Sequence, residues 1–239
     1  MDPVRFYDNY VDRQVRSGIN ERIHGLYRKV RSHGLRSDSR VLEIGCGIGA
    51  LTSLLCRRVR RGHIEAIDIS PASVAFARRH LPASPRVRLS ASDVTEYQPQ
   101  AAGFDTILLF DVLEHIPIAL HRAVLERIAG WMHQGSFLYV NIPNPEYILW
   151  DRKHRPESLQ ETDEPVRLPE LSAALDAAGL EILFMETWSV WAKEDYRFFA
   201  IRTKRPYNEI LVASERGIFS KVRHALLRRW RQIRNPFPR

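Results

Sequence analysis

The chain has 239 residues, of which 44% are hydrophobic and 27% are charged, a balance typical of a soluble globular protein with one main domain. No apolar run approaches the roughly 20 residues that cross a bilayer, and residues 1–20 lack the apolar core of a secretion signal. The two cysteines, Cys46 and Cys56, are too few for a zinc site. We therefore expect a cytoplasmic protein.

The formal net charge of +8 is concentrated locally. The carboxyl-terminal stretch "SKVRHALLRRWRQIRNPFPR" contains no acidic residue, whereas the rest of the chain is more balanced. The basicity therefore describes a tail and says little about a substrate.

Residues 1–35 have apolar residues at helical spacing and predict a helical cap. Short apolar runs then alternate with amphipathic stretches, which predicts parallel βαβ units in a doubly wound α/β sheet. The predicted strands are "RVLEIG", "HIEAIDIS", "RVRLSASD", "FDTILLF" and "SFLYVNIP".

The regular alternation stops after Pro143. Residues 144–167 are polar and too long for a simple connection, so we expect a lid insertion. A helix over "LPELSAALDAAGL" and an antiparallel pair, "EILFMETWSVW" and "YRFFAIRTK", then complete a domain of residues 36–208. Residues 209–239 form the basic amphipathic tail.

The first predicted strand runs into a glycine turn, "SRVLEIGCGIGAL". Gly45, Gly47 and Ala50 fit a dinucleotide fingerprint. Gly45, Gly47 and Gly49 after Glu43 also fit the turn that holds S-adenosylmethionine, whose sulfonium and amino group suit a nearby carboxylate. The turn alone leaves both cofactors open.

Two strand ends further along the chain bear on this choice. Asp68 follows the turn at the spacing of a ribose-binding acid and does not discriminate. Asp93, followed by Val94, is suited to an adenine amino group and ring. "FDTILLFDVLEHI" then ends a strand with an acid where the methyl group would lie. The order of these features favours S-adenosylmethionine over a dinucleotide.

The segments "LEIGCGIG", "AIDIS", "ASDV" and "FDTILLFDVLEHI" together resemble the four motifs of class I S-adenosylmethionine-dependent methyltransferases, particularly the small-molecule branch. The likeness covers about residues 38–145. It implies a Rossmann-like seven-stranded sheet with an antiparallel last strand.

The resemblance also implies which residues bind the cofactor. The glycine turn would lie against its amino-acid portion and ribose, Asp68 would accept the ribose hydroxyls, and Asp93 would take the adenine amino group. Phe110 and Asp111 would frame the methyl-bearing end. The implied cofactor-binding set is Glu43, Gly45, Cys46, Gly47, Asp68, Ile69, Asp93, Val94 and Phe110.

The stretch "DVLEH" supplies the catalytic candidates. On a helix, Asp111, Glu114 and His115 would share one face. His115 is favoured as a general base for an acceptor hydroxyl. Binding of a divalent metal is the less favoured alternative, suggested by a similar "E-x-x-E-H" helix in ubiquinone-biosynthesis O-methyltransferases, and a purely structural role is the third.

Aromatic residues and a histidine from the cap and the insertion are expected to line the acceptor site; these are Tyr7, Tyr10, Tyr147, Trp150 and His154. They suit O-methylation of a glycan, a lipid-linked sugar or a secondary metabolite. An RNA or protein methyltransferase, or a cofactor-binding protein without catalysis, remain the alternatives.

The tail repeats apolar residues at helical spacing among basic ones: Phe219, Val222, Leu226, Trp230 and Ile233. This pattern fits a helix on an anionic membrane surface or a helix packed on protein, with nucleic acid binding less favoured.

Overall fold

A computed structural model of the chain describes residues 3–8, 10–100, 103–156, 159, 163–207 and 217–234. The chain divides into two compact units, Met1–Lys204 and Arg205–Arg239. The predicted lid, 144–167, and the predicted tail, 209–239, each lie partly outside the described residues.

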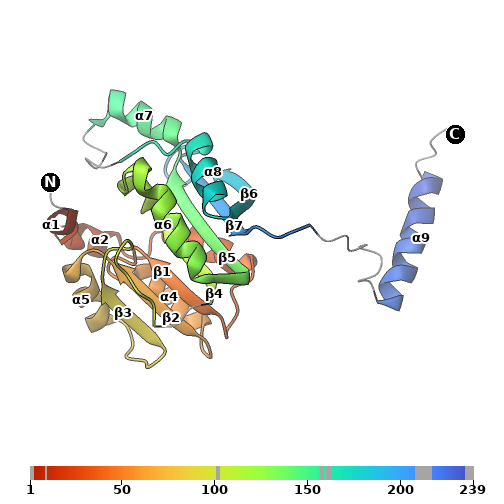
Figure 1. Cartoon of the computed structure of the whole chain (residues 1–239), viewed down its shortest axis with the longest axis horizontal. Coiled ribbons are helices and arrows are strands. Elements are labelled where there is room, and N and C mark those ends of the chain that lie inside the picture. Colours follow the sequence, from red (N-terminus) through yellow and green to blue (C-terminus); the bar gives the residue numbers. More distant parts are fainter. Residues whose placement is uncertain are drawn as a thin grey trace. The chain divides into compact units, whose positions relative to one another are not determined.

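The first unit is built on a sheet of seven strands (Figure 1). Its spatial order is β3-β2-β1-β4-β5-β7-β6, with β7 antiparallel to both β5 and β6 and the other pairs parallel. The predicted doubly wound sheet with an antiparallel last strand is confirmed. The strands are β1 (Arg40–Ile44), β2 (His63–Asp68), β3 (Val87–Ala91), β4 (Phe104–Phe110), β5 (Met132–Pro143), β6 (Leu180–Trp188) and β7 (Tyr196–Thr203).

Helices cover both faces of the sheet. Within the predicted 1–35 cap lie α1 (Pro3–Asp8), α2 (Val11–Ser17) and α3 (Glu21–Ser32). The remaining helices of this unit are α4 (Ala50–Arg58), α5 (Pro71–His80), α6 (Ile118–Gly130), α7 (Pro145–His154) and α8 (Leu168–Ala177). Helices α6 and α8 cover the face turned to the viewer in Figure 1.

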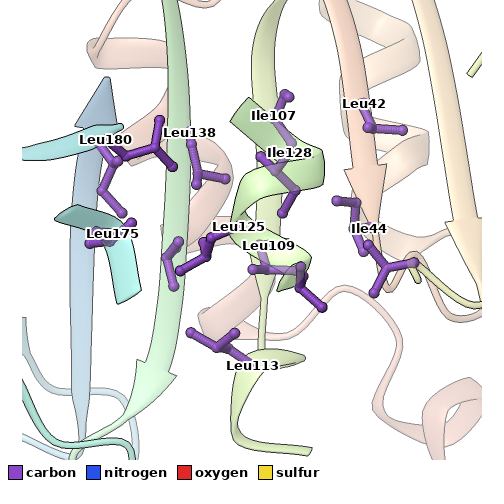
Figure 2. Close-up of a cluster of buried hydrophobic side chains, with 14 of the residues drawn as sticks. Leu42, Ile44, Ile107, Leu109, Leu113, Leu125, Ile128, Leu138, Leu175 and Leu180 are labelled. Carbon is purple, nitrogen blue, oxygen red and sulfur yellow. The ribbon is translucent and has the colours of Figure 1, made fainter. Parts of the chain in front are cut away.

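The strands send alternate side chains to two separate cores, as the two-residue period of a strand requires. Leu42 of β1 and Ile107 of β4 join the core under α6 and α8 (Figure 2). Val41 and Leu108, their neighbours, join the core under α3 and α4. Burial on both faces explains why these strands read as continuous apolar runs.

Two helices begin with the same signal, a polar cap followed by proline. Ser70 Oγ accepts a hydrogen bond of 3.0 Å from the Ser73 amide and Pro71 starts α5, as predicted. Asn144 Oδ1 likewise accepts a bond of 3.3 Å from the Glu146 amide at the start of α7. The predicted insertion therefore begins with a helix, because this cap and proline start one there.

The second unit contains α9 (Ile218–Arg234). In the part of the chain that the structure describes, no helix has the length and apolar character needed to cross a membrane.

Candidate functional site

The candidate site lies where the order of the strands reverses, between β1 and β4, the position at which doubly wound sheets bind ligands. Three cavities meet there, two of about 260 Å³ and one of about 720 Å³. Gln14, Gly45 and Asp111 line all three. Because they share these walls, ligands bound in two of the cavities would lie next to each other.

The glycine turn is fixed by hydrogen bonds to β2. The amides of Gly45 and Cys46 donate to the Ile67 carbonyl at 2.8 and 2.9 Å, and the Gly47 amide donates to Asp68 Oδ2 at 2.7 Å. At Gly45, φ is +80°, and an added Cβ would lie 2.2 Å from Val112 Cγ2. Glycine is therefore required at this position for both conformation and space.

Gly49 serves a different purpose. An added Cβ there would lie 2.9 Å from Leu81 Cδ1 and 3.0 Å from Ala77 Cβ, so this glycine allows α4 to begin close to α5. In glycine-rich strand-to-helix turns of this kind, the last glycine commonly allows such close packing.

One of the smaller cavities, called here the nucleoside cavity, is lined by the four residues predicted to hold ribose and adenine, namely Asp68, Ile69, Asp93 and Val94. Asp68 Oδ1 also accepts a hydrogen bond of 2.9 Å from the Ser70 amide, which holds the carboxylate at the end of β2. Burial is the main cause of the raised pKa of Asp68. Asp93 is oriented by bonds of 2.7 Å from the amide and hydroxyl of Thr95.

The other small cavity, called here the amino-acid cavity, is lined by Glu43, the glycine turn, Phe110, Arg22 and Asp111. Glu43 is only 3% exposed, and Thr52 Oγ1 donates to its Oε2 at 2.7 Å. Burial raises the pKa of Glu43 to about 8, so this side chain is mostly protonated at neutral pH. Glu43 thus lines the predicted place, where burial favours its protonated form.

Asp111 does not lie on a helix with Glu114 and His115, contrary to expectation. It follows β4 with φ of +55°, and a single 3₁₀ turn, η1 (Leu113–His115), comes after it. Its carboxylate is held on both sides: Asn141 Nδ2 donates to Oδ1 at 2.7 Å, and Arg22 pairs with Oδ2. These partners stabilise a backbone conformation that is unfavourable for aspartate in isolation.

Asn141 is itself oriented from the edge of the sheet. Trp188 Nε1 donates to Asn141 Oδ1 at 3.0 Å, which leaves the Asn141 amide nitrogen directed at Asp111. The guanidinium of Arg22 lies over the rings of Trp191 and Tyr196. Asp111 is therefore a fixed acidic group in the wall of the cavities.

His115 forms an acid–base pair with Asp163 from the insertion. His115 Nδ1 lies 3.1 Å from Asp163 Oδ1, and both side chains are mostly buried. Burial lowers the pKa of His115, but the hydrogen bond to Asp163 and the charge of Glu114 outweigh it, and the net pKa is raised. A neutral imidazole that donates from Nδ1 keeps Nε2 as its basic nitrogen.

Glu114 is buried behind this pair. Burial raises its pKa to about 8, and within the described residues its Oε2 has no hydrogen-bond partner. The Glu114 carbonyl accepts a bond of 2.8 Å from the Glu164 amide, which attaches the end of the insertion to η1. Among the described residues, no three histidine, cysteine, aspartate or glutamate side chains form a group suited to a metal ion.

The large cavity is lined by three of the predicted aromatic residues, Tyr7, Tyr10 and Tyr147. Trp150 and His154 line none of the three cavities. They stack on each other at 4.4 Å between ring centroids, while α7 presents Ile148 and Asp151 to the cavity instead.

Several residues of the site escaped the sequence analysis. Arg22 and Asp163 belong to no recognisable motif and reach the site only through tertiary packing. Trp191, 61% exposed, lines both the large and the amino-acid cavity. Its loop is held by buried Asp195, whose carboxylate accepts the amides of residues 190–192 at 2.8 to 3.0 Å. An aspartate that accepts backbone amides within a turn can be predicted from sequence, although it does not indicate ligand binding.

Comparison with known proteins shows what this chain is similar to. Residues 41–135, from β1 into β5, match the model of a methyltransferase domain. The predicted resemblance to S-adenosylmethionine-dependent methyltransferases is confirmed.

Curated proteins similar to this chain include O-methyltransferases. A ubiquinone biosynthesis O-methyltransferase of Xylella fastidiosa is 32% identical over 61% of this chain and 62% of its own length. A trans-aconitate 2-methyltransferase of Methylobacterium nodulans is 34% identical over 46% of this chain and 40% of its own. The chain spans about three fifths of the length of the first of these relatives.

Solved structures of methyltransferases share the fold of the first unit. A magnesium protoporphyrin IX methyltransferase of Synechocystis with bound S-adenosylhomocysteine superimposes with a TM-score of 0.62, at 18% identity, over 82% of this chain and 87% of that one. An N-methyltransferase of Bradyrhizobium japonicum gives 0.62 at 20% identity, over 83% and 99%. At these identities the comparison shows the architecture and leaves the acceptor atom open.

Proposed function

We propose that this protein transfers the methyl group of S-adenosylmethionine to a hydroxyl oxygen of a small acceptor, such as a glycan, a lipid-linked sugar or a secondary metabolite. The observation that carries the proposal is the position of the His115–Asp163 pair. His115 lines both the nucleoside cavity and the large cavity. O-methylation requires a base that lies between the cofactor site and the acceptor site, and His115 lies in a wall common to both cavities.

The two small cavities fit the cofactor. Asp68 and Asp93 supply acceptors for ribose hydroxyls and an adenine amino group in the nucleoside cavity. In the amino-acid cavity, Arg22 and Asp111 present one positive and one negative group, which match the carboxylate and ammonium of an amino acid. The curated O-methyltransferases and the structure with bound S-adenosylhomocysteine support this assignment.

The catalytic work left to the protein is alignment and proton transfer. When bound, S-adenosylmethionine supplies a methyl group on a sulfonium that departs as a neutral thioether, so no acid is needed to assist the leaving group. His115 Nε2 would accept the proton of the acceptor hydroxyl and so make its oxygen a better nucleophile. Asp163 holds the imidazole and stabilises the imidazolium that forms.

The large cavity favours a polyhydroxylated acceptor. Its volume of about 720 Å³ is lined by aromatic faces, including Tyr147 and Trp191, and by carboxylates, including Asp151. Aromatic faces pack on the carbon–hydrogen faces of sugar rings, while carboxylates accept hydrogen bonds from their hydroxyls. The geometry therefore supports a glycan over a purely apolar acceptor.

The test is transfer of a labelled methyl group from S-adenosylmethionine to fractionated sugars, lipids, RNA and protein. We expect an ether product from the sugar or lipid-linked sugar fraction. His115→Ala should lower the rate of transfer roughly 10²–10⁴-fold with little change in cofactor affinity. His154→Ala, outside all three cavities, is the matched control and should leave the rate unchanged.

Other outcomes would redirect the proposal. Labelling of RNA or protein alone would identify a macromolecular methyltransferase. Cofactor binding without turnover on any fraction would indicate a binding protein. Loss of activity with a chelator and recovery with magnesium would replace the base mechanism with a metal mechanism.

A further inference from the structure

Helix α9 carries a narrow stripe of exposed apolar side chains. The members of this stripe are between 52% and 93% exposed: Phe219, Val222, Leu226, Trp230 and Ile233. At about 100° per residue, their spacing places all of them within roughly 80° of the helix circumference. Large apolar residues gathered on one face in this way mark an interaction surface.

Positive charge surrounds the stripe. The helix contains six lysines and arginines and no acidic residue. By the same helical geometry, Arg223 and Arg234 flank one side of the stripe and Arg229 flanks the other, while Lys221 and Arg228 lie opposite. The partner must therefore accept apolar side chains and also be negatively charged along both flanks.

Only some partners satisfy both demands. A nucleic acid would pair with the arginines and leave Phe219 and Leu226 in water. An apolar protein groove would cover the stripe, but it would not explain why all the charged residues of the helix are basic. An anionic bilayer meets both, because its phosphates lie at the level of the flanking arginines and its acyl chains lie just beneath.

We infer that α9 binds the surface of an anionic lipid bilayer and lies in its plane, with the apolar stripe inserted between the headgroups. Each cation near such a surface raises binding about fivefold at moderate ionic strength, and salt screens the effect. The stripe supplies the remaining attraction and sets the orientation of the helix.

The full-length protein is tested by co-sedimentation with vesicles of phosphatidylcholine, alone or mixed equally with phosphatidylglycerol. We expect binding to the mixed vesicles, binding ~10-fold or more weaker to phosphatidylcholine alone, and release by salt. The double variant Leu226→Gln/Trp230→Gln should bind the mixed vesicles ~10-fold or more weakly. Ala225→Gln, which adds the same polar group outside the stripe, should bind as the unaltered protein does.

Three results would overturn the inference. The first is equal binding to neutral and anionic vesicles. The second is that the protein binds a labelled RNA and not vesicles, and that Leu226→Gln/Trp230→Gln still binds the RNA. The third is a lower melting temperature of the double variant without lipid, which would show that the stripe packs on protein. Because lipid binding is the readout, failure of the methyl-transfer proposal leaves this test intact.

Discussion

Replacement of Gly45 by alanine tests whether the glycine turn is as tightly enclosed as the structure shows. The new Cβ would lie 2.2 Å from Val112 Cγ2, far inside normal contact, and the backbone has φ of +80°. Alanine at positive φ costs about 1–2 kcal/mol. Displacement of Val112 adds about 1–3 kcal/mol as an overpacking cost. Gly45→Ala should therefore lower the free energy of unfolding by ~2–5 kcal/mol.

The two costs are separated by a double-mutant cycle measured by urea unfolding. Val112→Ala removes the Cγ2 atom that the new methyl group meets, so the double variant should lose ~1–3 kcal/mol less than the sum of the single variants. The backbone cost at Gly45 should remain. Gly130→Ala is the control, because an added Cβ there meets no atom within 4 Å.

Strict additivity in this cycle would refute the reasoning, since it would mean that the side chain of Val112 does not limit the turn. A Gly45→Ala variant as stable as the unaltered protein would refute the positive φ as well. Because Gly45 lines all three cavities, the same variant should also bind S-adenosylhomocysteine more weakly.

Three further predictions follow from the site. Asp68→Ala should weaken binding of S-adenosylhomocysteine in calorimetry, with NAD not bound by either protein; NAD binding tighter than that of S-adenosylhomocysteine would contradict the cofactor assignment. Asp163→Asn should lower the pKa of His115 and move the acidic limb of the rate profile to lower pH; an unmoved limb would argue against His115 as the base. The pKa of Glu43 is about 8 in the folded state and 4.5 ordinarily. Between these two pH values the folded state binds a proton that the unfolded state has lost, so the free energy of unfolding falls as the pH rises towards 8. Glu43→Gln should remove a slope of up to about 1.4 kcal/mol per pH unit in urea unfolding, and an unchanged slope would contradict the raised pKa.

The parts of the site that sequence predicts are those built from local pattern. The glycine turn and the acids at strand ends, Asp68 and Asp93, follow from short segments in a fixed order along the chain. Their convergence follows from the parallel sheet, which brings the carboxyl ends of neighbouring strands to one edge.

The parts that sequence does not predict depend on distant partners. Asp111 leaves the helical pattern because Asn141 and Arg22 hold it at positive φ, and both partners are remote in the chain. Asp163 reaches His115 from an insertion without periodicity. The helix after Asn144 differs, because its cap and proline are local signals in the sequence, whereas the length and polarity of the whole segment are typical of a loop.

The antiparallel direction of β7 has a consequence for how such a protein changes over generations. Because β7 starts opposite Pro143, at the carboxyl end of β5, the connection from β6 to β7 meets the same edge of the sheet as the cofactor turns. From this loop, Trp191 reaches both the large cavity and the amino-acid cavity, but not the nucleoside cavity. Under the proposed function, substitutions of Trp191 would change the wall shared by the acceptor and the amino-acid end of the methyl donor, and would leave the wall of the nucleoside cavity unchanged. The acceptor site could then change over generations while the residues around the nucleoside stay the same.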